Sequence, residues 1–310
     1  MSIRLEQTVP FGRSLREYES MFSLDAGDCQ GHILDCAAGP SSFNAELTAA
    51  GGRVCSIDPL YQFTGAEIQR QFFSTLDHVI EQVRATPQNW VWGYRDPEDL
   101  RRNRIAAMET FVADYSGGSR TGRYVCGALP NLPFEADRFD LALSSHFLFL
   151  YSDHFDAAFH LAAIRALLQV ARELRIFPLL ALRAERSQHV DPVCEELRRE
   201  GHHLSIDRVE YELQRGGNEM LRVQAPDLQC DGEMHGDSAL SAEIRDRLPP
   251  DSTLTGEANL LSLRIDRYRR PYEGTDAPRE AMQGYLDWEF GLVAQLGRDG
   301  THGFRVLGAS

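Results

Sequence analysis

Short apolar runs alternate along the chain with segments in which apolar residues recur every three or four positions. The short runs predict buried strands over residues 32–37, 53–58, 123–128, 139–144 and 174–180. The segments with helical spacing predict helices over residues 14–24, 43–50, 65–86, 96–115, 156–173 and 192–201. Strands that alternate with helices favour an α/β fold, a mostly parallel sheet with helices on both of its faces.

Two more strands are predicted over residues 203–213 and 218–224, because the QRGG sequence between them is typical of a turn. Such a hairpin adds an antiparallel edge to the sheet. The run of four apolar residues 147–150 reads as a continuation of the fourth strand, and residues 116–122 read as a loop.

The pattern changes after residue 225, where Gly, Pro, Asp and Ser become more frequent. We therefore expect one domain over residues 1–225 and a small α+β extension of unknown role over residues 226–310. In the extension, the pattern predicts a strand over residues 259–265 and a helix over residues 277–296.

The charged residues disfavour one class of binding partner and exclude several kinds of catalytic site. The 310 residues carry 32 basic and 46 acidic side chains, a formal net charge of −14, which disfavours nucleic acid as a partner. Every base is an arginine, so the chain excludes Walker A loops, pyridoxal-phosphate Schiff bases and Ser-Lys hydrolases, which all need a lysine. The arginine-rich residues 101–104 are interpreted as a solvated helix face, and residues 264–272 (RIDRYRRPY) as an interaction or folding surface.

Cysteine and histidine spacing gives no sign of a metal site or of a disulfide framework. The six cysteines form no C-x-x-C pair, and the adjacent His202 and His203 would point to opposite sides of a strand. The first 13 residues include charges and lack the apolar stretch of a signal peptide, and no run of 18 apolar residues occurs. We expect a cytoplasmic protein with free thiols, no metal and no membrane contact.

The candidate chemistry lies where two predicted strands end. Parallel sheets bind ligands at the carboxyl ends of their strands. The first strand ends with Asp35-Cys36-Ala37 and leads into a bend with Gly39, where the backbone can approach a ligand closely. Asp58 ends the second strand, and an acid at this place can accept hydrogen bonds from both hydroxyls of a ribose. Together the bend and the acid indicate a nucleoside-binding site.

The bend does not have the G-x-G-x-x-G spacing that a dinucleotide needs, which disfavours a nicotinamide-dependent oxidoreductase. It resembles motif I of class I S-adenosylmethionine-dependent methyltransferases, an acid followed by small residues at every second place. Residues 58–60 (DPL) resemble motif II, residues 132–140 (LPFEADRFD) resemble the stretch before the fourth strand in methyltransferase type 11 proteins, and residues 211–223 resemble the closing hairpin. The resemblance covers about residues 12–224 and implies a Rossmann-like class I methyltransferase sheet.

The resemblance also implies roles for single residues. Those expected to hold the methionine part of the cofactor are Asp35, Ala37 and Gly39. Asp58 would hold the ribose. The residues expected around the adenine are Pro59, Leu60, Ala128 and Leu129, and those expected to face the methyl group are Ser144 and Ser145. Two positions depart from the family pattern, since Ala37 replaces the first glycine and Ala128 stands where many relatives have an acid.

Three more residues are candidates for chemistry or substrate contact. His146 follows the two serines and could act as a base toward a hydroxyl or thiol. Arg13 and Tyr18 could close over the cofactor carboxylate or the substrate. The aromatic-rich insertion over residues 63–122 lies where the resemblance places a substrate lid, which favours a partly apolar substrate.

The sequence therefore predicts methyl transfer from S-adenosylmethionine to a small molecule. The absence of an Asn/Asp-Pro-Pro-Tyr motif after the fourth strand gives no support to nucleobase amino methylation. The alternative is a non-catalytic nucleoside-binding or regulatory module, in which the extension docks a protein partner or a second copy of the chain.

Overall fold

The computed structural model describes residues 11–91 and 96–224. The chain divides into two units, Met1–Asp227 and Leu228–Ser310, and every described residue belongs to the first unit. The strand and helix predicted after residue 225, together with the surface at residues 264–272, lie outside the described residues.

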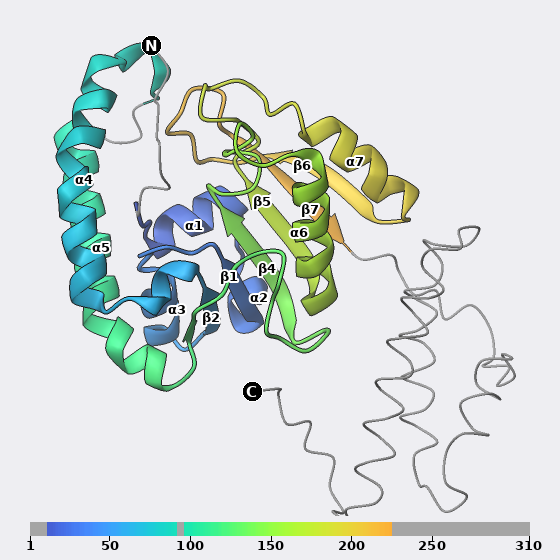
Figure 1. Ribbon diagram of the computed structural model, residues 1–310, viewed down its shortest axis with the longest axis horizontal. Helices are drawn as coiled ribbons and strands as arrows, with labels where there is room; N and C mark the ends of the chain where they lie inside the picture. The colour runs from blue at the N-terminus through green and yellow to red at the C-terminus, as the bar shows by residue number, and fades with distance from the viewer. Residues whose placement is uncertain (1–10, 92–95, 225–310) are drawn as a thin grey trace, which may run out of the picture. The chain divides into compact units, whose positions relative to one another are not determined.

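Seven strands in the described residues form one sheet in the order β3-β2-β1-β4-β5-β7-β6 (Figure 1). They are β1 (His32–Cys36), β2 (Arg53–Ile57), β3 (Tyr124–Val125), β4 (Phe139–Ser145), β5 (Ala171–Phe177), β6 (His203–Arg208) and β7 (Glu219–Gln224). Strands β1 to β5 pair in parallel, and β7 is antiparallel to both of its neighbours. The mostly parallel, Rossmann-like sheet with an antiparallel closing hairpin, expected from the sequence, is confirmed.

The α-helices are α1 (Leu15–Phe22), α2 (Ala26–Gln30), α3 (Phe43–Ala49), α4 (Gly65–Ala85), α5 (Pro97–Arg120), α6 (Ala157–Val170) and α7 (Val190–Arg199). Two short 3₁₀ helices, η1 (Pro59–Gln62) and η2 (Pro87–Asn89), join them. Local chemistry sets several helix starts. Ser14 and Glu17 form a capping box at α1, Thr64 and Glu67 form another at α4, and Asp156 caps α6.

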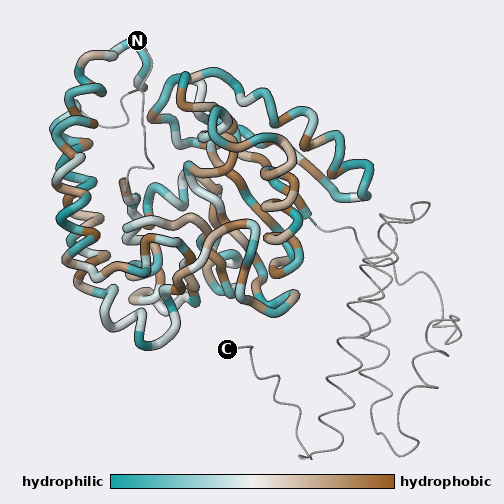
Figure 2. The backbone as a smooth tube through the Cα atoms, in the orientation of Figure 1, coloured by the Kyte–Doolittle hydropathy of each residue, from teal (hydrophilic) through white to brown (hydrophobic). Residues whose placement is uncertain are grey.

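Successive side chains of a strand point to opposite faces of the sheet. Because apolar side chains project from both faces here, helices cover both of them. On one face Leu34 and Ala142 pack with α6 and α7, and on the other Ile33 and Leu143 pack with α1 and α3. Figure 2 shows the resulting brown, hydrophobic interior strands beneath helices with teal outer surfaces.

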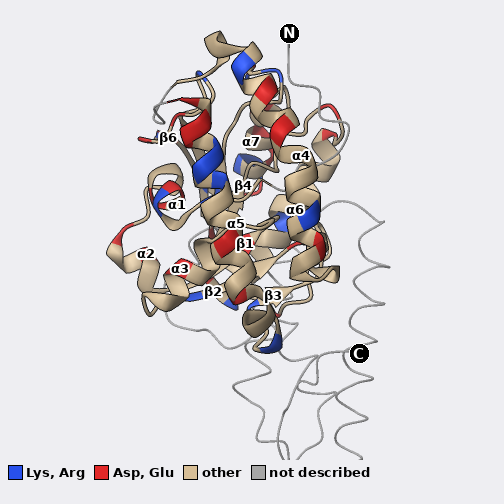
Figure 3. Ribbon diagram, turned by 90° about the vertical axis from the view of Figure 1, so that its left-hand side faces the viewer, with Lys and Arg blue, Asp and Glu red and all other residues tan. Residues whose placement is uncertain are grey.

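The insertion after β2 is a pair of long helices, α4 and α5, which lie side by side at one edge of the molecule (Figure 1). Ile68, Phe72 and Phe111 are among the residues of the apolar core between them. Acidic and basic residues are interspersed along the helices on the side shown in Figure 3. The prediction of a solvated face at residues 101–104 is wrong for Arg104, which is fully buried and ion-paired with Glu17 of α1.

Several other predictions differ from the structure in extent. Helix α5 continues through the predicted loop to Arg120, and β3 is only two residues long. A Cβ at Gly118 would lie 2.4 Å from the Tyr124 ring, so α5 can approach β3 this closely only with glycine there. The strand predicted over residues 203–213 ends at Arg208. Helix α6 ends at Val170 and β5 starts at once, so residues 171–173 are strand and not helix. The apolar residues 147–150 form turns and not strand, with Phe149 at φ 66°.

Candidate functional site

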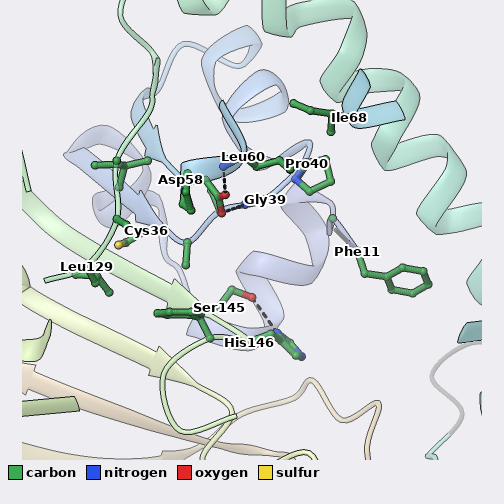
Figure 4. Close-up of a pocket in the computed structure, with 18 of the residues that line it drawn as sticks. Phe11, Cys36, Gly39, Pro40, Asp58, Leu60, Ile68, Leu129, Ser145 and His146 are labelled. Carbon is green, nitrogen blue, oxygen red and sulfur yellow. Dashed lines mark hydrogen bonds between the residues drawn. The ribbon is translucent and has the colours of Figure 1, made fainter. Parts of the chain in front are cut away.

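A cavity of about 890 Å³ lies at the carboxyl ends of β1, β2 and β4 and extends beneath the start of α4. Of the predicted site residues, those that line it are Arg13, Tyr18, Ala37, Gly39, Asp58, Pro59, Leu60, Ala128, Leu129, Ser145 and His146. Figure 4 shows Asp58 bonded to Gly39 and Leu60 on one side, with the Ser145–His146 pair on another. Asp35 and Ser144 do not line the cavity.

The bend after β1 brings the glycine turn and the strand-end acid together. Ala37 and Gly39 both have φ 55°, in the left-handed region that favours glycine. The Gly39 N–H donates to Asp58 Oδ2 (2.8 Å), and the Leu60 N–H donates to Asp58 Oδ1 (2.7 Å). The carboxylate thus ties the two strand ends together, and its remaining lone pairs can accept further hydrogen bonds.

Burial raises the pKa of Asp58, and the two backbone N–H donors oppose this rise by stabilising the charged form. The space over Gly39 is open, since a Cβ built there meets no atom within 4 Å. An accepting carboxylate therefore stands beside a backbone turn that a ligand can approach closely.

The segment before α1 lies directly on this turn. A Cβ at Gly12 would lie 2.0 Å from the Pro40 carbonyl oxygen, so the two backbones touch. The Arg13 carbonyl accepts from the Ser41 hydroxyl (2.8 Å) and from the Ser42 N–H (3.0 Å). These contacts bring Arg13 to the cavity, a role for Gly12 that sequence reasoning missed.

Arg13 offers an unused donor at the cavity. One guanidinium N–H donates to the Phe11 carbonyl (3.0 Å), while the Nε atom is buried and has no hydrogen-bond partner among the described residues. A buried donor without a partner is costly, and an acceptor on a ligand would relieve that cost.

Asp35 and Ser144 depart from their predicted places because strand side chains alternate between faces. Asp35 points toward α1, where it is fully buried and accepts from the Tyr18 hydroxyl (3.0 Å) and the Ser56 hydroxyl (3.3 Å). Burial raises its pKa to about 7. Tyr18 lines the cavity in front of it. Ser144 points into the core, and its hydroxyl has no partner among the described residues.

Ser145 and His146 end β4 at the opposite wall. Ser145 Oγ lies 2.9 Å from His146 Nδ1 and 3.9 Å from Met21 Sδ. His146 has φ 54°, and its backbone N–H donates to the Phe177 backbone carbonyl (2.6 Å). Burial, with the charges of Arg13 and Arg104, holds the pKa of His146 well below its usual range, so the imidazole is neutral near pH 7.

Several cavity residues were not predicted from the sequence. The turns after β4 and the first turn of α6 supply four aromatic side chains, those of Phe147, Tyr151, Phe155 and Phe159. The start of the insertion supplies Phe63, Glu67 and Ile68. The insertion was expected to cover the substrate, and of its described residues those that line the cavity come from its first part. The phenylalanines of residues 147–159 were the available signal, but residues 147–150 were assigned to a strand and residues 156–159 to the start of a helix.

Among residues 11–91 and 96–224, no group of three or more His, Cys, Asp or Glu side chains could hold a metal ion. In the same residues, no helix combines the length and the apolar composition needed to cross a bilayer.

Other comparisons match shorter parts of the chain to proteins of different kinds. The model of the phosphate acetyl/butaryl transferase family matches residues 203–263, from β6 into the residues for which the sequence analysis offered no family. A 43-residue stretch, 14% of this chain, is 65% identical to the NAD-dependent malic enzyme of Rhizobium meliloti and 56% identical to the NADP-dependent malic enzyme of Escherichia coli. The stretch spans 6% of the length of each malic enzyme.

Solved structures similar to this chain include methyltransferases. The glycopeptide N-methyltransferase MtfA in complex with S-adenosylhomocysteine is 12% identical over 72% of this chain and 94% of its own, with a TM-score of 0.36. Magnesium protoporphyrin IX methyltransferase from Synechocystis PCC 6803, with bound SAM, is 13% identical over 64% of this chain and 72% of its own, with a TM-score of 0.34. These activities are those of the matched proteins.

A relative from an archaeon covers far more of the sequence. Uncharacterized protein MJ0045 of Methanocaldococcus jannaschii is 32% identical over 224 residues, which are 72% of this chain and 98% of the relative. The chain therefore belongs to the same family as MJ0045.

Proposed function

We propose that this protein transfers a methyl group from S-adenosylmethionine to a small molecule. The observation that carries the proposal is the Asp58 carboxylate, held 2.8 Å from the Gly39 N–H at the edge of the 890 Å³ cavity. This is the pairing of glycine bend and strand-end acid that the motif resemblance implies for an adenosyl ligand.

The cavity has groups that match each part of this donor. Asp58 retains lone pairs for the two ribose hydroxyls, and the apolar side chains of Leu60 and Leu129 offer contact to an adenine ring. The unpartnered Nε of Arg13 can donate to the carboxylate of the methionine part. The open space over Gly39 admits the chain that links the two parts.

When bound, S-adenosylmethionine supplies an activated methyl group on a sulfonium. The residues of this chain orient the two reactants and exclude water. His146, neutral near pH 7, can take a proton from the acceptor at its ring nitrogen, and Ser145 fixes the direction of the ring.

Calorimetry tests the proposal. S-adenosylhomocysteine should bind, and Asp58→Ala should weaken it at least about tenfold through loss of hydrogen bonds to a charged acceptor. Asp207→Asn, on edge strand β6 away from the cavity, is the matched control and should bind like the unmodified chain. Circular dichroism would confirm that both variants fold.

Four results would contradict it. The proposal fails if the folded protein does not bind S-adenosylhomocysteine, or if Asp58→Ala and Asp207→Asn bind it equally. Adenosine that binds as tightly as S-adenosylhomocysteine would indicate the nucleoside-binding module instead, because the methionine part would then contribute nothing. NADH binding would support the oxidoreductase interpretation.

A further inference from the structure

Beyond the groups assigned to the methyl donor, the cavity has a wall of a different kind. Phe147, Tyr151, Phe155 and Phe159 line it from the turns after β4 and the first turn of α6. The rings of Phe155 and Phe159 stack at 4.2 Å, and the Phe147 ring lies 5.5 Å from Phe155. We call these four residues the aromatic wall.

The aromatic wall leaves apolar ring surface uncovered. In the same turns Leu148 and Phe149 are fully buried in the core, whereas Phe147, Phe155 and Phe159 are only partly buried. Phe11 lines the cavity as well and packs on Phe72 of α4. A ligand that covers the rings removes this surface from water, and a flat ring adds stacking contacts that an aliphatic ligand cannot make.

The cavity is lined by more groups than those assigned to the methyl donor. Its volume is about 890 Å³, and its lining includes His146 and the aromatic wall as well as the groups around Asp58. The residues assigned to the methyl donor, around Asp58, form only one part of the cavity lining. The part between His146 and the aromatic wall is therefore left for the acceptor.

At the junction of the two parts, the polar groups favour an acceptor with an ionisable hydroxyl. Ser145 Oγ lies 2.9 Å from His146 Nδ1, and in the tautomer whose Nδ1 donates to Ser145 Oγ, Nε2 carries the accepting lone pair. The positive charge of Arg13 acts on the same imidazole, and it disfavours a cationic ligand there while favouring an oxygen that gains negative charge.

We infer that the aromatic wall binds a flat aromatic compound whose hydroxyl group is directed at His146 Nε2. This inference rests on the proposed methyl transfer. The hydroxyl oxygen gives its proton to Nε2 while one of its lone pairs forms the bond to the methyl carbon. The carbon–sulfur bond breaks, and its electron pair stays on the sulfur, which becomes a neutral thioether.

Calorimetry on the protein saturated with S-adenosylhomocysteine tests the inference with three probes of similar size. 2-Naphthol should bind about tenfold more tightly than decahydro-2-naphthol, which has the hydroxyl but no aromatic ring. It should also bind about tenfold more tightly than 2-naphthylmethylamine, which has the ring and a positive charge.

Variants locate the binding. The double variant Phe155→Leu/Phe159→Leu should reduce the preference for 2-naphthol over its saturated analogue to about twofold. Phe73→Leu, an exposed phenylalanine of α4 outside the cavity, is the matched control and should keep the full preference. His146→Leu should weaken 2-naphthol binding about fivefold. Phe73→Leu and the double variant should bind S-adenosylhomocysteine as the unmodified chain does.

The inference is overturned if 2-naphthol does not bind, if its saturated or cationic analogue binds equally well, or if the double variant keeps the preference. The titration of S-adenosylhomocysteine alone reports separately on the proposed methyl transfer. Binding of 2-naphthol to the protein without S-adenosylhomocysteine then shows whether the aromatic wall works independently of the donor.

Discussion

The two parts of the cavity are built in different ways. The part around Asp58 consists of backbone, a bend with two left-handed residues and a carboxylate that accepts two N–H bonds of 2.7–2.8 Å. The part around the aromatic wall consists of side chains that come from turns and from an inserted helix pair. A site made of backbone permits one ligand geometry, whereas a wall of rings admits many flat molecules. The protein thus combines a constrained part of the cavity, which we propose binds the methyl donor (the donor part), with an adaptable part, which we propose binds the acceptor (the acceptor part).

The support beneath the two parts differs as well. The bend rests on the sheet itself, through Asp35 and the Tyr18 hydroxyl. The insertion over the acceptor part is tied to α1 by the buried pair of Arg104 and Glu17, with Nη–Oε distances of 2.6 and 2.7 Å. Tyr211 donates to the same carboxylate (3.0 Å). Four substitutions separate these contributions.

The largest effect is expected for Arg104→Ala, because it leaves the Glu17 carboxylate buried without its cation. The free energy of unfolding should fall by about 3–5 kcal/mol in urea denaturation at pH 7. Arg102→Ala, on the exposed side of the same helix in a pair with Asp99, should cost less than about 1 kcal/mol. Equal losses in the two variants would show that the buried pair does not hold the insertion.

Asp35→Asn should change the pH dependence of stability beneath the donor part. Burial raises the pKa of Asp35 to about 7, against about 4 when unfolded. Between these values the unfolded chain loses its proton first, so stability falls as the pH rises from 4 to 7, by up to about 4 kcal/mol. The Asn variant should lack this fall, which urea denaturation at pH 5 and pH 8 measures. An unchanged slope would contradict the assignment.

His160→Leu should change the pH dependence of stability with the opposite sign to Asp35→Asn. His160 lies close to Phe149 and Phe159, next to the aromatic wall. His160 is fully buried, neither ring nitrogen has a partner among the described residues, and burial lowers its pKa to about 4. The unfolded chain, with a pKa near 6.5, takes up the proton first, so stability falls as the pH drops from 6.5 to 4, by about 3 kcal/mol. Denaturation of the variant at pH 7 and pH 5 should show this loss removed. Persistence of the loss would assign it to another group.

The smallest effect is expected for Ala37→Gly. Ala37 has φ 55°, where a Cβ costs about 1 kcal/mol, so glycine should raise the melting temperature by a few degrees. Ala37 also lines the cavity, and loss of its methyl group should leave S-adenosylhomocysteine binding equally tight or tighter. A lower melting temperature together with weaker binding would mean that the methyl group makes a needed contact.

The sequence predicted the donor part better than the acceptor part. Asp58 and Gly39 were found because strand ends and turn residues leave a local signal, and the parallel sheet brings such ends to one edge. Asp35 was placed wrongly, since alternation along β1 turns it toward α1. The wall of Phe147, Phe155 and Phe159 was missed, because an apolar run does not reveal which of its members face the core.

By itself, the sequence determined the order of strands and helices, the closing hairpin and the positions of Gly39 and Asp58 at the cavity, because periodicity and turn chemistry act over a few residues. Tertiary structure alone decided the burial of Arg104, the contact of Gly12 with Pro40 and the exposure of the aromatic wall. These features depend on segments that are distant in the chain and meet only when the sheet and its helices pack, so no local pattern encodes them.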